Sequence, residues 1–194
     1  IRRQRQMCIR DRYLGWVMKS SLVAGDAHFL EAWEKKPKLI VTANYGQIWE
    51  EPRPNYCHPV SDIVMGNKII NLGLQKGWYH VELPDGRKGY VQADKVKEWE
   101  KFKNHGKVRS QDLVELAYRF LGIPYFWGGR STKGFDCSGF TQTIYKMNGI
   151  QLPRDANMQI RVGSPVVVDS SLENLKPGDL LFFGRSKERV THVG

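Results

Sequence analysis

The sequence predicts an α+β protein in which a small all-β barrel precedes a part built from helices and strands. Residues 38–97 hold short β-rich runs separated by turn residues, at the spacing of about 8–12 residues that is typical of small barrels. After residue 97 the apolar residues change to a helical period, and two short strands return near the end of the chain. A chain of 194 residues has room for one ordinary domain or two small ones.

The all-β part is expected to contain five strands. They cover residues 39–43, 60–65, 68–74, 78–83 and 89–91, with turn-forming residues such as Gly, Pro and Asn in the breaks between them. Asp85-Gly86 separates two strands of alternating apolar residues, which is a strong signal for a β-hairpin.

The part that follows is expected to begin with two helices. In the first, apolar residues recur at the spacing of one buried helix face: Leu113, Leu116, Ala117, Phe120 and Leu121. Ser110 is the expected N-cap of this helix, and Gly122 and Pro124 end it. The second helix runs from about residue 137 to residue 148, and strands at residues 180–183 and 190–193 complete this part.

The N-terminal residues carry a short internal repeat. Residues 14–22 align without gaps on residues 88–96, matching a Gly, an aromatic residue, a Val and a closing aliphatic residue. We interpret residues 13–22 as the remnant of a first barrel and residues 23–37 as a linker with a short helix. Residues 1–12 match neither a targeting signal nor a domain, and we expect them to be a non-native tail outside the fold.

The formal net charge of +10 is not concentrated on one segment that could bind nucleic acid. Five arginines and one aspartate in residues 1–12 account for +4 of it, and residues 38–100 are neutral with eight basic and eight acidic residues. The other basic residues are scattered, so we expect no sequence-specific nucleic-acid binding, while attraction to an anionic polymer such as the cell wall stays open. The longest apolar run, residues 180–183, is far shorter than the ~20 residues of a transmembrane helix, so no transmembrane segment is expected.

Cys137 is the candidate nucleophile. It lies between a Gly-rich loop and an amphipathic helix, at or beside the first helical position, where unpaired N–H groups and the helix dipole favour a reactive thiolate. A buried structural cysteine is the competing interpretation, but polar Asp136 and Ser138 flank the thiol, which fits the lip of a cleft better. Cys8 and Cys57 complete an odd number of cysteines without a Cys-x-x-Cys motif, so no disulfide framework, metal or organic cofactor is expected.

His192 is the candidate base. It stands on an apolar strand 55 residues after Cys137, and a Cys–His pair needs to be adjacent only in space. The competing interpretation is a half-buried histidine with a structural role. The other histidines lie in the linker, in the all-β part or between the two parts, where a catalytic role is less expected: His28, His58, His80 and His105.

Five sequence signatures follow one another in the second part. They are Leu121-Gly122-Ile123-Pro124-Tyr125-Phe126-Trp127-Gly128-Gly129, Phe135-Asp136-Cys137-Ser138-Gly139-Phe140, Leu152-Pro153-Arg154-Asp155-Ala156, Leu175-Lys176-Pro177-Gly178-Asp179-Leu180 and Thr191-His192-Val193-Gly194. In this order they resemble the NlpC-type cell-wall cysteine peptidases, with residues 107–194 as the catalytic domain. Residues 38–97 resemble the bacterial SH3-like domains that often precede such a domain.

The resemblance implies a papain-like fold, in which a helix with the nucleophile packs on an antiparallel sheet with the histidine. It also implies hydrolysis of peptidoglycan stem peptides, commonly at the bond from γ-D-glutamate to a diamino acid. Cys137 would attack that carbonyl group, and His192 would take the thiol proton and later return one to the leaving amine. The backbone N–H of Cys137 and the Tyr125 hydroxyl would stabilise the oxyanion.

Family members with paired SH3-like domains prefer a free N-terminal L-alanine. The resemblance then implies that Asp136, helped by Ser138, holds the ammonium group and that Trp127 lines the pocket. The expected partner is a peptidoglycan peptide or muropeptide. The expected location is the cell envelope or the exterior, although enzymes that recycle wall fragments in the cytoplasm share the architecture.

The family's third polar residue, usually a second histidine, is expected on the strand after His192, beyond the last residue of this chain. We therefore expect a chain that is truncated at both ends and poorly active. One alternative is a catalytically incomplete module that binds cell-wall peptides. Another is a related acyl transferase or phospholipid hydrolase, but relatives with those activities usually have the histidine before the cysteine.

Overall fold

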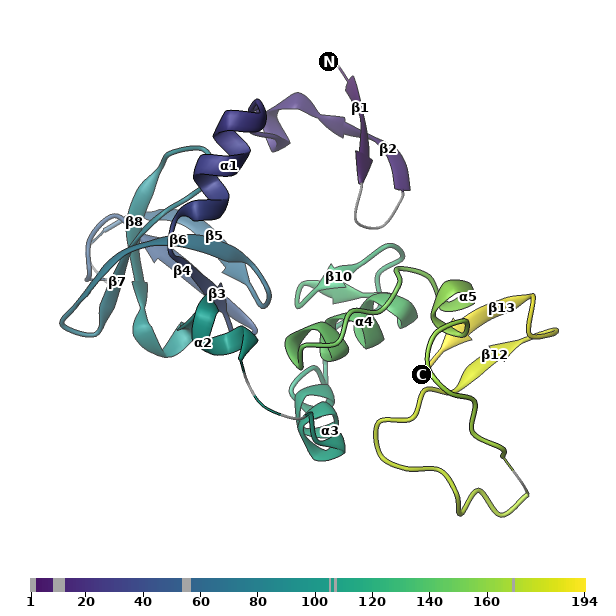
Figure 1. Cartoon of the computed structure of the whole chain (residues 1–194). Helices are drawn as coiled ribbons and strands as arrows, with labels where there is room; N and C mark the ends of the chain where they lie inside the picture. Colours follow the sequence, from purple (N-terminus) through teal and green to yellow (C-terminus); the bar gives the residue numbers. More distant parts are fainter. Residues whose placement is uncertain (1–2, 9–12, 54–56, 105, 107, 169) are drawn as a thin grey trace.

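The computed structural model of the chain describes residues 3–8, 13–53, 57–104, 106, 108–168 and 170–194. Two units lie side by side: a sheet unit formed by residues 38–98 and a mixed unit of helices and short strands from residue 110 onward (Figure 1). A separate two-stranded hairpin lies near the N-terminus. The mixture of helices and strands agrees with the α+β class expected from the sequence.

Seven strands make up the sheet unit, and every neighbouring pair is antiparallel, in the order β5-β4-β8-β7-β6-β3-β9. In chain order they are β3 (Lys38–Val41), β4 (Tyr45–Trp49), β5 (Pro59–Val64), β6 (Lys68–Gln75), β7 (Trp78–Glu82), β8 (Lys88–Gln92) and β9 (Val96–Glu98). The short 3-10 helix Ala93–Lys95 joins β8 to β9. Strands β4 and β9 are additional to the five that the sequence predicts.

The sheet curls around a core of its own. Buried side chains from the middle of the sheet and from both of its edges share one cluster, including Ile63 of edge strand β5 and Val96 of edge strand β9. A flat sheet would keep its two edges apart, so this cluster requires strong curvature. A bulge between Asn71 and Gly73 on β6, where Gly73 has a φ of +136°, adds local twist. The sheet is therefore strongly curved around its own core.

The predicted hairpin at Asp85-Gly86 is confirmed. Strands β7 and β8 pair on either side of it, Gly86 has a φ of +84°, and its N–H donates to the Leu83 carbonyl at 3.0 Å.

Strand β4 has no such turn or alternation signal in the sequence. Its inward positions are Gly46 and Ile48, so one side chain alone carries the apolar alternation.

The mixed unit contains α3 (Ser110–Tyr118), α4 (Cys137–Met147) and the short α5 (Ala156–Gln159). Two small hairpins accompany them, β10 (Arg130–Ser131) with β11 (Gly134–Phe135), and β12 (Phe182–Gly184) with β13 (Val190–Val193). The expected N-cap of the first helix is wrong by one residue. Ser110 is already helical, and the N-cap is Arg109, whose extended backbone directs its N–H to the Asp112 carboxylate at 3.3 Å.

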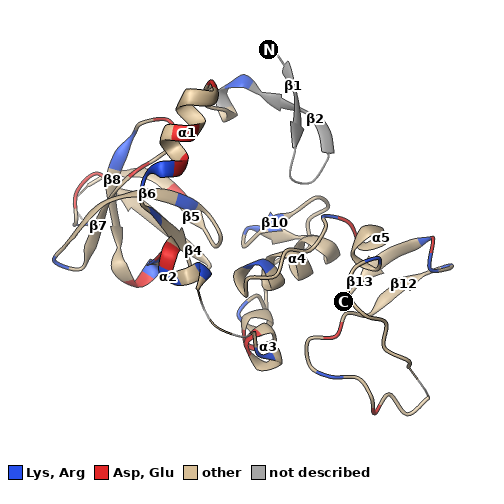
Figure 2. Ribbon diagram, in the orientation of Figure 1, with Lys and Arg blue, Asp and Glu red and all other residues tan. Residues whose placement is uncertain are grey.

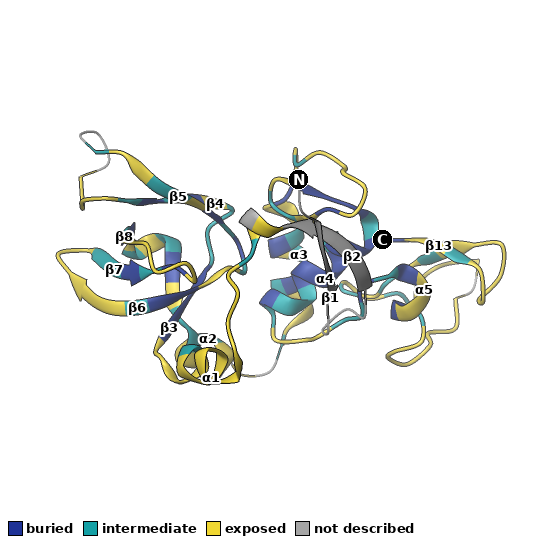
Figure 3. Cartoon of the chain, turned by 90° about the horizontal axis from the view of Figure 1, so that it is seen from above, coloured by how far each residue is buried: buried dark blue, intermediate teal, exposed yellow. Residues whose placement is uncertain are grey.

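The two units share a second apolar core. Neighbouring side chains of β3 point in opposite directions, so Leu39 and Val41 enter the core of the sheet, while Ile40 packs with residues of α3 and α4. Met65, after β5, joins Ile40 in this shared core. Helix α2 (Trp99–Lys103) bridges the units by contributing Trp99 and Phe102 to the same cluster. Figure 3 shows buried residues on the facing elements of both units.

Polar contacts also join the units. Arg119, after α3, donates from Nη2 to the Thr42 carbonyl at 2.9 Å, and Asn44 Nδ2 donates to the Arg119 carbonyl at 2.7 Å. On the other side of the contact, Lys133 pairs with Asp62 of β5. The hairpin β10–β11 is thus supported by the sheet unit close to the start of α4.

The N-terminal part contains a hairpin that the sequence does not predict. Residues of the expected tail form β1 (Arg3–Cys8), which pairs in antiparallel fashion with β2 (Tyr13–Met18). Residues 1–2 and 9–12 of that tail lie outside the described residues. A 3-10 turn (Lys19–Ser21) follows β2, and the expected linker helix is α1 (Ala27–Lys35), capped by the Asp26 carboxylate.

Lysine and arginine residues are spread along the described ribbon among the acidic residues, without a basic stripe in the view of Figure 2. Within the described residues, no helix combines the length and the apolar character that crossing a membrane requires.

The shared core predicts that the two units unfold together. Ile40→Ala removes methyl groups from a fully packed position and should lower the free energy of unfolding by about 2–5 kcal/mol, measured by chemical denaturation and calorimetry. Ile48→Ala, in the sheet's own core, is the matched control. Both variants should move a single cooperative transition. Two separate transitions, of which Ile40→Ala moves only one, would contradict the prediction.

Candidate active site

Cys137 is the first residue of α4, and Asp136 is the N-cap of this helix. The Asp136 Oδ1 atom accepts a hydrogen bond from the backbone N–H of Gly139 at 2.6 Å. The thiol therefore lies at the N-terminal turn, where N–H groups without helical partners create a positive potential. This is the position that the sequence predicts for it.

The start of α4 packs against the backbone of the loop before it. A Cβ atom at Gly139 would lie 2.1 Å from the Gly129 carbonyl oxygen, and the Asp136 N–H donates to this same oxygen at 3.1 Å. Gly128 has a φ of +78°, in the left-handed region that favours glycine. Because these glycines allow the close approach, the aromatic residues 125–127 border the first turn of the helix.

Arg154 and Asp136 form a buried ion pair beside the thiol. Arg154 Nη1 donates to Asp136 Oδ1 at 3.0 Å and to Ser138 Oγ at 2.8 Å, and Arg154 Nη2 contacts Asp136 Oδ2. Arg154, Asp136 and Ser138 are 8%, 7% and 5% exposed. One guanidinium group therefore links the two residues that flank Cys137.

The Asp136 carboxylate is kept ionised by this arrangement. Burial by itself raises its pKa, but hydrogen bonds from Arg154 and from the N–H groups of Gly139 and Gly128, with the charge of Arg154, outweigh burial. The pKa of Asp136 is therefore below its ordinary value. The Gly128 N–H donates to Oδ2 at 3.0 Å, which ties the Gly-rich loop to the same carboxylate.

The segment that carries Arg154 is fixed to α4 by a second set of hydrogen bonds. Gln159 is 1% exposed, and its Nε2 donates to the carbonyl oxygens of Ser138 at 3.0 Å and Pro153 at 2.9 Å. Thr141 Oγ1 donates to Gln159 Oε1 at 2.8 Å. Segment 152–159 and the first turns of α4 thus form one hydrogen-bonded block.

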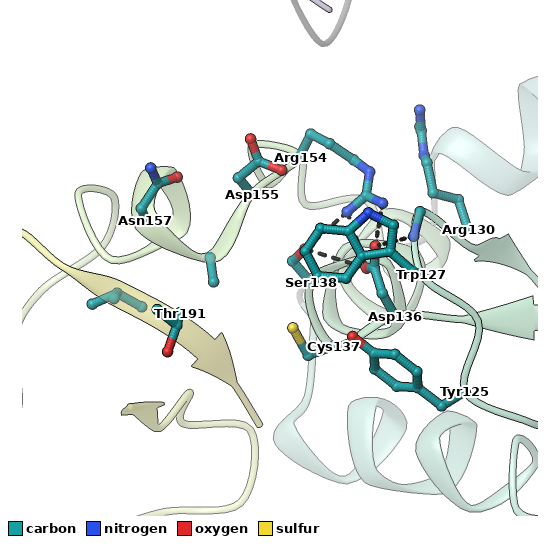
Figure 4. Close-up of a pocket in the computed structure, with 13 residues that line it drawn as sticks. Tyr125, Trp127, Arg130, Asp136, Cys137, Ser138, Arg154, Asp155, Asn157 and Thr191 are labelled. Carbon is teal, nitrogen blue, oxygen red and sulfur yellow. Dashed lines mark hydrogen bonds and ion pairs between the residues drawn. The ribbon is translucent and has the colours of Figure 1, made fainter. Parts of the chain in front are cut away.

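A pocket with a volume of about 510 Å³ opens beside Cys137 (Figure 4). Its volume lies within the ~300–1,000 Å³ of small-ligand sites. Tyr125 and Trp127 line it from the loop before α4, and Asp155 and Thr191 line it from the segment before α5 and from β13. Trp127 is 85% exposed, at the mouth of the pocket.

The Tyr125 hydroxyl points toward Cys137 (Figure 4). Desolvation, together with the negative charges of Cys137 as a thiolate and of Asp136, raises the pKa of Tyr125 above its ordinary value. The hydroxyl group therefore stays protonated at neutral and moderately alkaline pH, and it can donate a hydrogen bond to an oxygen atom bound beside the thiol.

His192 does not line this pocket, contrary to the expectation that it lies beside Cys137. The pocket wall from β13 is formed by Val190 and Thr191. The imidazole of His192 instead lies next to Phe183, with ring centroids 5.9 Å apart, where β12 and β13 pair. The physical reason is strand geometry: Val193, the next residue of β13, is buried with an exposed fraction of 2%, and the neighbouring side chain of His192 faces the other way and is exposed.

Asp136, the residue expected to hold a substrate ammonium group, lines the pocket and is engaged by Arg154. Sequence reasoning gave Arg154 and Asp155 no role. Asp155 is a second carboxylate, beside Asp136, that lines the pocket (Figure 4). Both residues belong to the sequence signature Leu152-Pro153-Arg154-Asp155-Ala156, which could have pointed to them. The signature does not show what each side chain contacts.

Among the described residues, no group of three or more His, Cys, Asp or Glu side chains is placed to hold a metal ion. Cys57, the other cysteine with a described side chain, is a free thiol that contacts the Arg53 carbonyl oxygen at 3.1 Å in the sheet unit. It lies outside the pocket that Cys137 lines.

Comparison with known proteins gives consistent results for the mixed unit. The model of the NlpC/P60 family matches residues 122–194. The chain is 33% identical over 183 residues to a gamma-D-glutamyl-L-lysine dipeptidyl-peptidase of Bacillus cereus, covering 93% of the chain and 53% of that protein. It is 38% identical over 125 residues to the protein of the same name from Bacillus subtilis, covering 63% of the chain and 39% of that protein.

A solved structure agrees with these matches. The crystal structure of an NlpC/P60 family protein from Bacillus cereus superposes with a TM-score of 0.77 at 33% identity, over 93% of this chain and 57% of that one. The chain thus spans about half the length of these Bacillus cereus proteins. The family match and the likeness of sequence and fold show that residues 122–194 of this chain are a domain of the NlpC/P60 family.

Proposed function

We propose that this chain is part of a cysteine peptidase that hydrolyses peptidoglycan stem peptides. The proposed bond joins γ-D-glutamate to a diamino acid, in fragments with a free N-terminal L-alanine. The observation that carries the proposal is Cys137 at the N-terminal turn of α4, beside the Tyr125 hydroxyl in a pocket of about 510 Å³. Two relatives named gamma-D-glutamyl-L-lysine dipeptidyl-peptidase support this choice of bond.

In the proposed reaction the Cys137 sulfur attacks the γ-carbonyl carbon of the glutamate. A C–S bond forms, and the carbonyl oxygen becomes an oxyanion that the Cys137 N–H and the Tyr125 hydroxyl stabilise. The C–N bond then breaks, and the amine leaves with the proton that the thiol gave up. Water hydrolyses the thioester, returning the thiol and releasing the glutamate carboxylate.

His192 is the proposed carrier of that proton. This role requires β13 to bring His192 to the pocket that Val190 and Thr191 now line. A change of one residue in the register of a strand exchanges its two faces, and β12 and β13 already have a register irregularity between Phe183 and Gly184. The proposal therefore includes a rearrangement of β13 before the reaction.

The substrate ammonium group is proposed to lie near Asp155 rather than on Asp136. Both carboxylates line the pocket, but Asp136 is buried and bound by Arg154. Trp127 at the mouth offers an apolar surface to the peptide. Ser138 keeps the role of a polar neighbour of the thiol, although its hydroxyl accepts a hydrogen bond from Arg154.

The domain assignment is proposed in the same terms. Residues 38–97 form an SH3-like domain, which the curled seven-stranded sheet supports. Residues 107–194 form a papain-like catalytic domain, supported by the contacts of α4 with β13. The proposed location is the cell envelope, where peptidoglycan is found.

A second candidate function is a module that binds cell-wall peptides without cleaving them. The position of His192 outside the pocket favours this alternative. Both candidate functions use the same pocket. Both therefore predict that the chain binds the peptide, but only the peptidase also cleaves it.

The first prediction concerns Cys137. Cys137→Ala should abolish release of L-lysine from L-alanyl-γ-D-glutamyl-L-lysine, measured by chromatography with single-turnover sensitivity, while retaining peptide binding by calorimetry. Cys57→Ala, which changes the other described thiol, should leave both unchanged. Equal cleavage by Cys137→Ala and the unchanged chain would contradict the peptidase proposal. Binding by both without cleavage would support the binding-module alternative.

The second prediction concerns Tyr125. Tyr125→Phe removes one proposed oxyanion donor and should lower kcat by about 10²–10³-fold with little change in KM. Because the pKa of Tyr125 is raised, the unchanged chain should keep its Tyr125-dependent activity up to at least pH 9. Tyr118→Phe, at the exposed end of α3, is the matched control. An unchanged kcat in Tyr125→Phe would show that the Tyr125 hydroxyl does not stabilise the oxyanion.

The third prediction compares neighbouring residues of β13. If His192 reaches the thiol, His192→Ala should lower kcat by at least about 10²-fold, whereas Thr191→Val should change it by less than tenfold. The reverse order of effects would mean that β13 stays in the observed register during the reaction, and that His192 takes no proton.

A further inference from the structure

Arg154 is a buried positive group beside the start of α4, and it has no assigned role. Arg154 donates to Asp136 and Ser138, the residues on either side of Cys137, and all three are more than nine-tenths buried. Arg154 does not need to touch a substrate to influence the thiol, since it holds both of the thiol's neighbours.

Asp136 creates an electrostatic conflict. As the N-cap it is the acceptor that shapes the first turn, but as a buried anion next to Cys137 it disfavours formation of a thiolate. A negative charge at this place also cancels the positive potential that the N-terminal turn offers. The guanidinium of Arg154, within 3.0 Å of the same carboxylate, removes most of this negative field.

We propose that Arg154 is a positioning residue that neutralises Asp136, so that the helix N-terminus acts undiminished on Cys137. The same guanidinium fixes the first turn by its hydrogen bond to Ser138. The inference rests on the proposed function, because the ionisation of the Cys137 thiol matters only if Cys137 is the nucleophile. It adds a residue that acts through Asp136 and not on the scissile bond.

The segment around Arg154 is held rigidly enough for this role. Gln159 anchors it to α4 through the Ser138 carbonyl at 3.0 Å, and Gln142 Nε2 donates to the Leu152 carbonyl at 3.0 Å. The backbone around Arg154 therefore cannot move away from α4 without breaking these hydrogen bonds. This also links the pocket wall at Asp155 to the helix that carries the nucleophile.

The other charged or titratable groups around the thiol come from separate elements. Tyr125 lies in the loop before β10, Arg130 on β10, and Asp155 at the N-cap of α5. His192 stands on β13, outside the pocket. These groups stay the same in the variants below, so changes in thiol reactivity report on the Arg154–Asp136 pair.

The test measures the rate of Cys137 alkylation by iodoacetamide between pH 5 and pH 10, with the labelled peptide identified by mass spectrometry. Arg154→Met leaves Asp136 uncompensated, and the midpoint of the profile should move up by about one pH unit, a tenfold loss of thiolate below the midpoint. Asp136→Asn keeps a good N-cap and leaves Arg154 uncompensated, so the midpoint should move down.

The double variant Asp136→Asn/Arg154→Met removes both charges and should return the midpoint to within a few tenths of a unit of the unchanged chain. A purely structural role predicts shifts that follow loss of stability, and these would have the same sign in both single variants. Arg161→Met, which changes an exposed arginine outside the pocket, is the control and should have no effect.

Folding of each variant is checked by circular dichroism. If Arg154→Met does not fold, the other two variants still test the proposal. Asp136→Asn must move the midpoint down, and the double variant must restore it. An unchanged midpoint in folded single variants would overturn the proposal. Alkylation requires no peptidase activity, so the predicted shifts without turnover would count against the proposed function alone, and turnover without the shifts would count against this inference alone.

Discussion

The carboxylate of Asp136 is buried at the start of α4, and it remains ionised there because the guanidinium of Arg154 is buried with it. Much of the site depends on this pair. Asp136 caps the helix that begins with Cys137 and binds the Gly128 N–H of the aromatic loop. Arg154 brings in the segment that supplies Asp155 to the pocket. Removing one partner would leave an isolated buried charge, which typically costs about 3–5 kcal/mol.

The sheet unit contributes to the same site from the opposite side. Strand β3 sends Leu39 and Val41 into the sheet and Ile40 into the core beneath α3 and α4. The ion pair between Lys133 and Asp62 holds the hairpin that leads into Asp136 and Cys137. The sheet unit therefore supports the elements that surround the pocket beside Cys137.

Local patterns in the sequence were enough to predict the elements with strong signals. The helix that begins at Cys137 and the hairpin at Asp85-Gly86 both follow from spacing and turn chemistry. Strand β4 was not predicted, because Gly46 takes one of its inward positions and leaves no alternation of apolar side chains. The sequence did not predict the ion pair between Arg154 and Asp136 or the outward face of His192. The ion pair joins residues 18 positions apart, and the face of His192 depends on how β13 pairs with β12, which local patterns do not show.

The most direct test of the account is covalent labelling with L-alanyl-γ-D-glutamate that carries a chloromethyl ketone in place of the scissile amide, followed by intact-mass and peptide-mass analysis. A nucleophile in the pocket at the start of α4 predicts one adduct per chain, on Cys137, formed more slowly when free L-alanyl-γ-D-glutamate competes. Labelling of Cys57 at the same rate as Cys137, or labelling that the free dipeptide does not slow, would contradict the assignment of this pocket as the peptidase site.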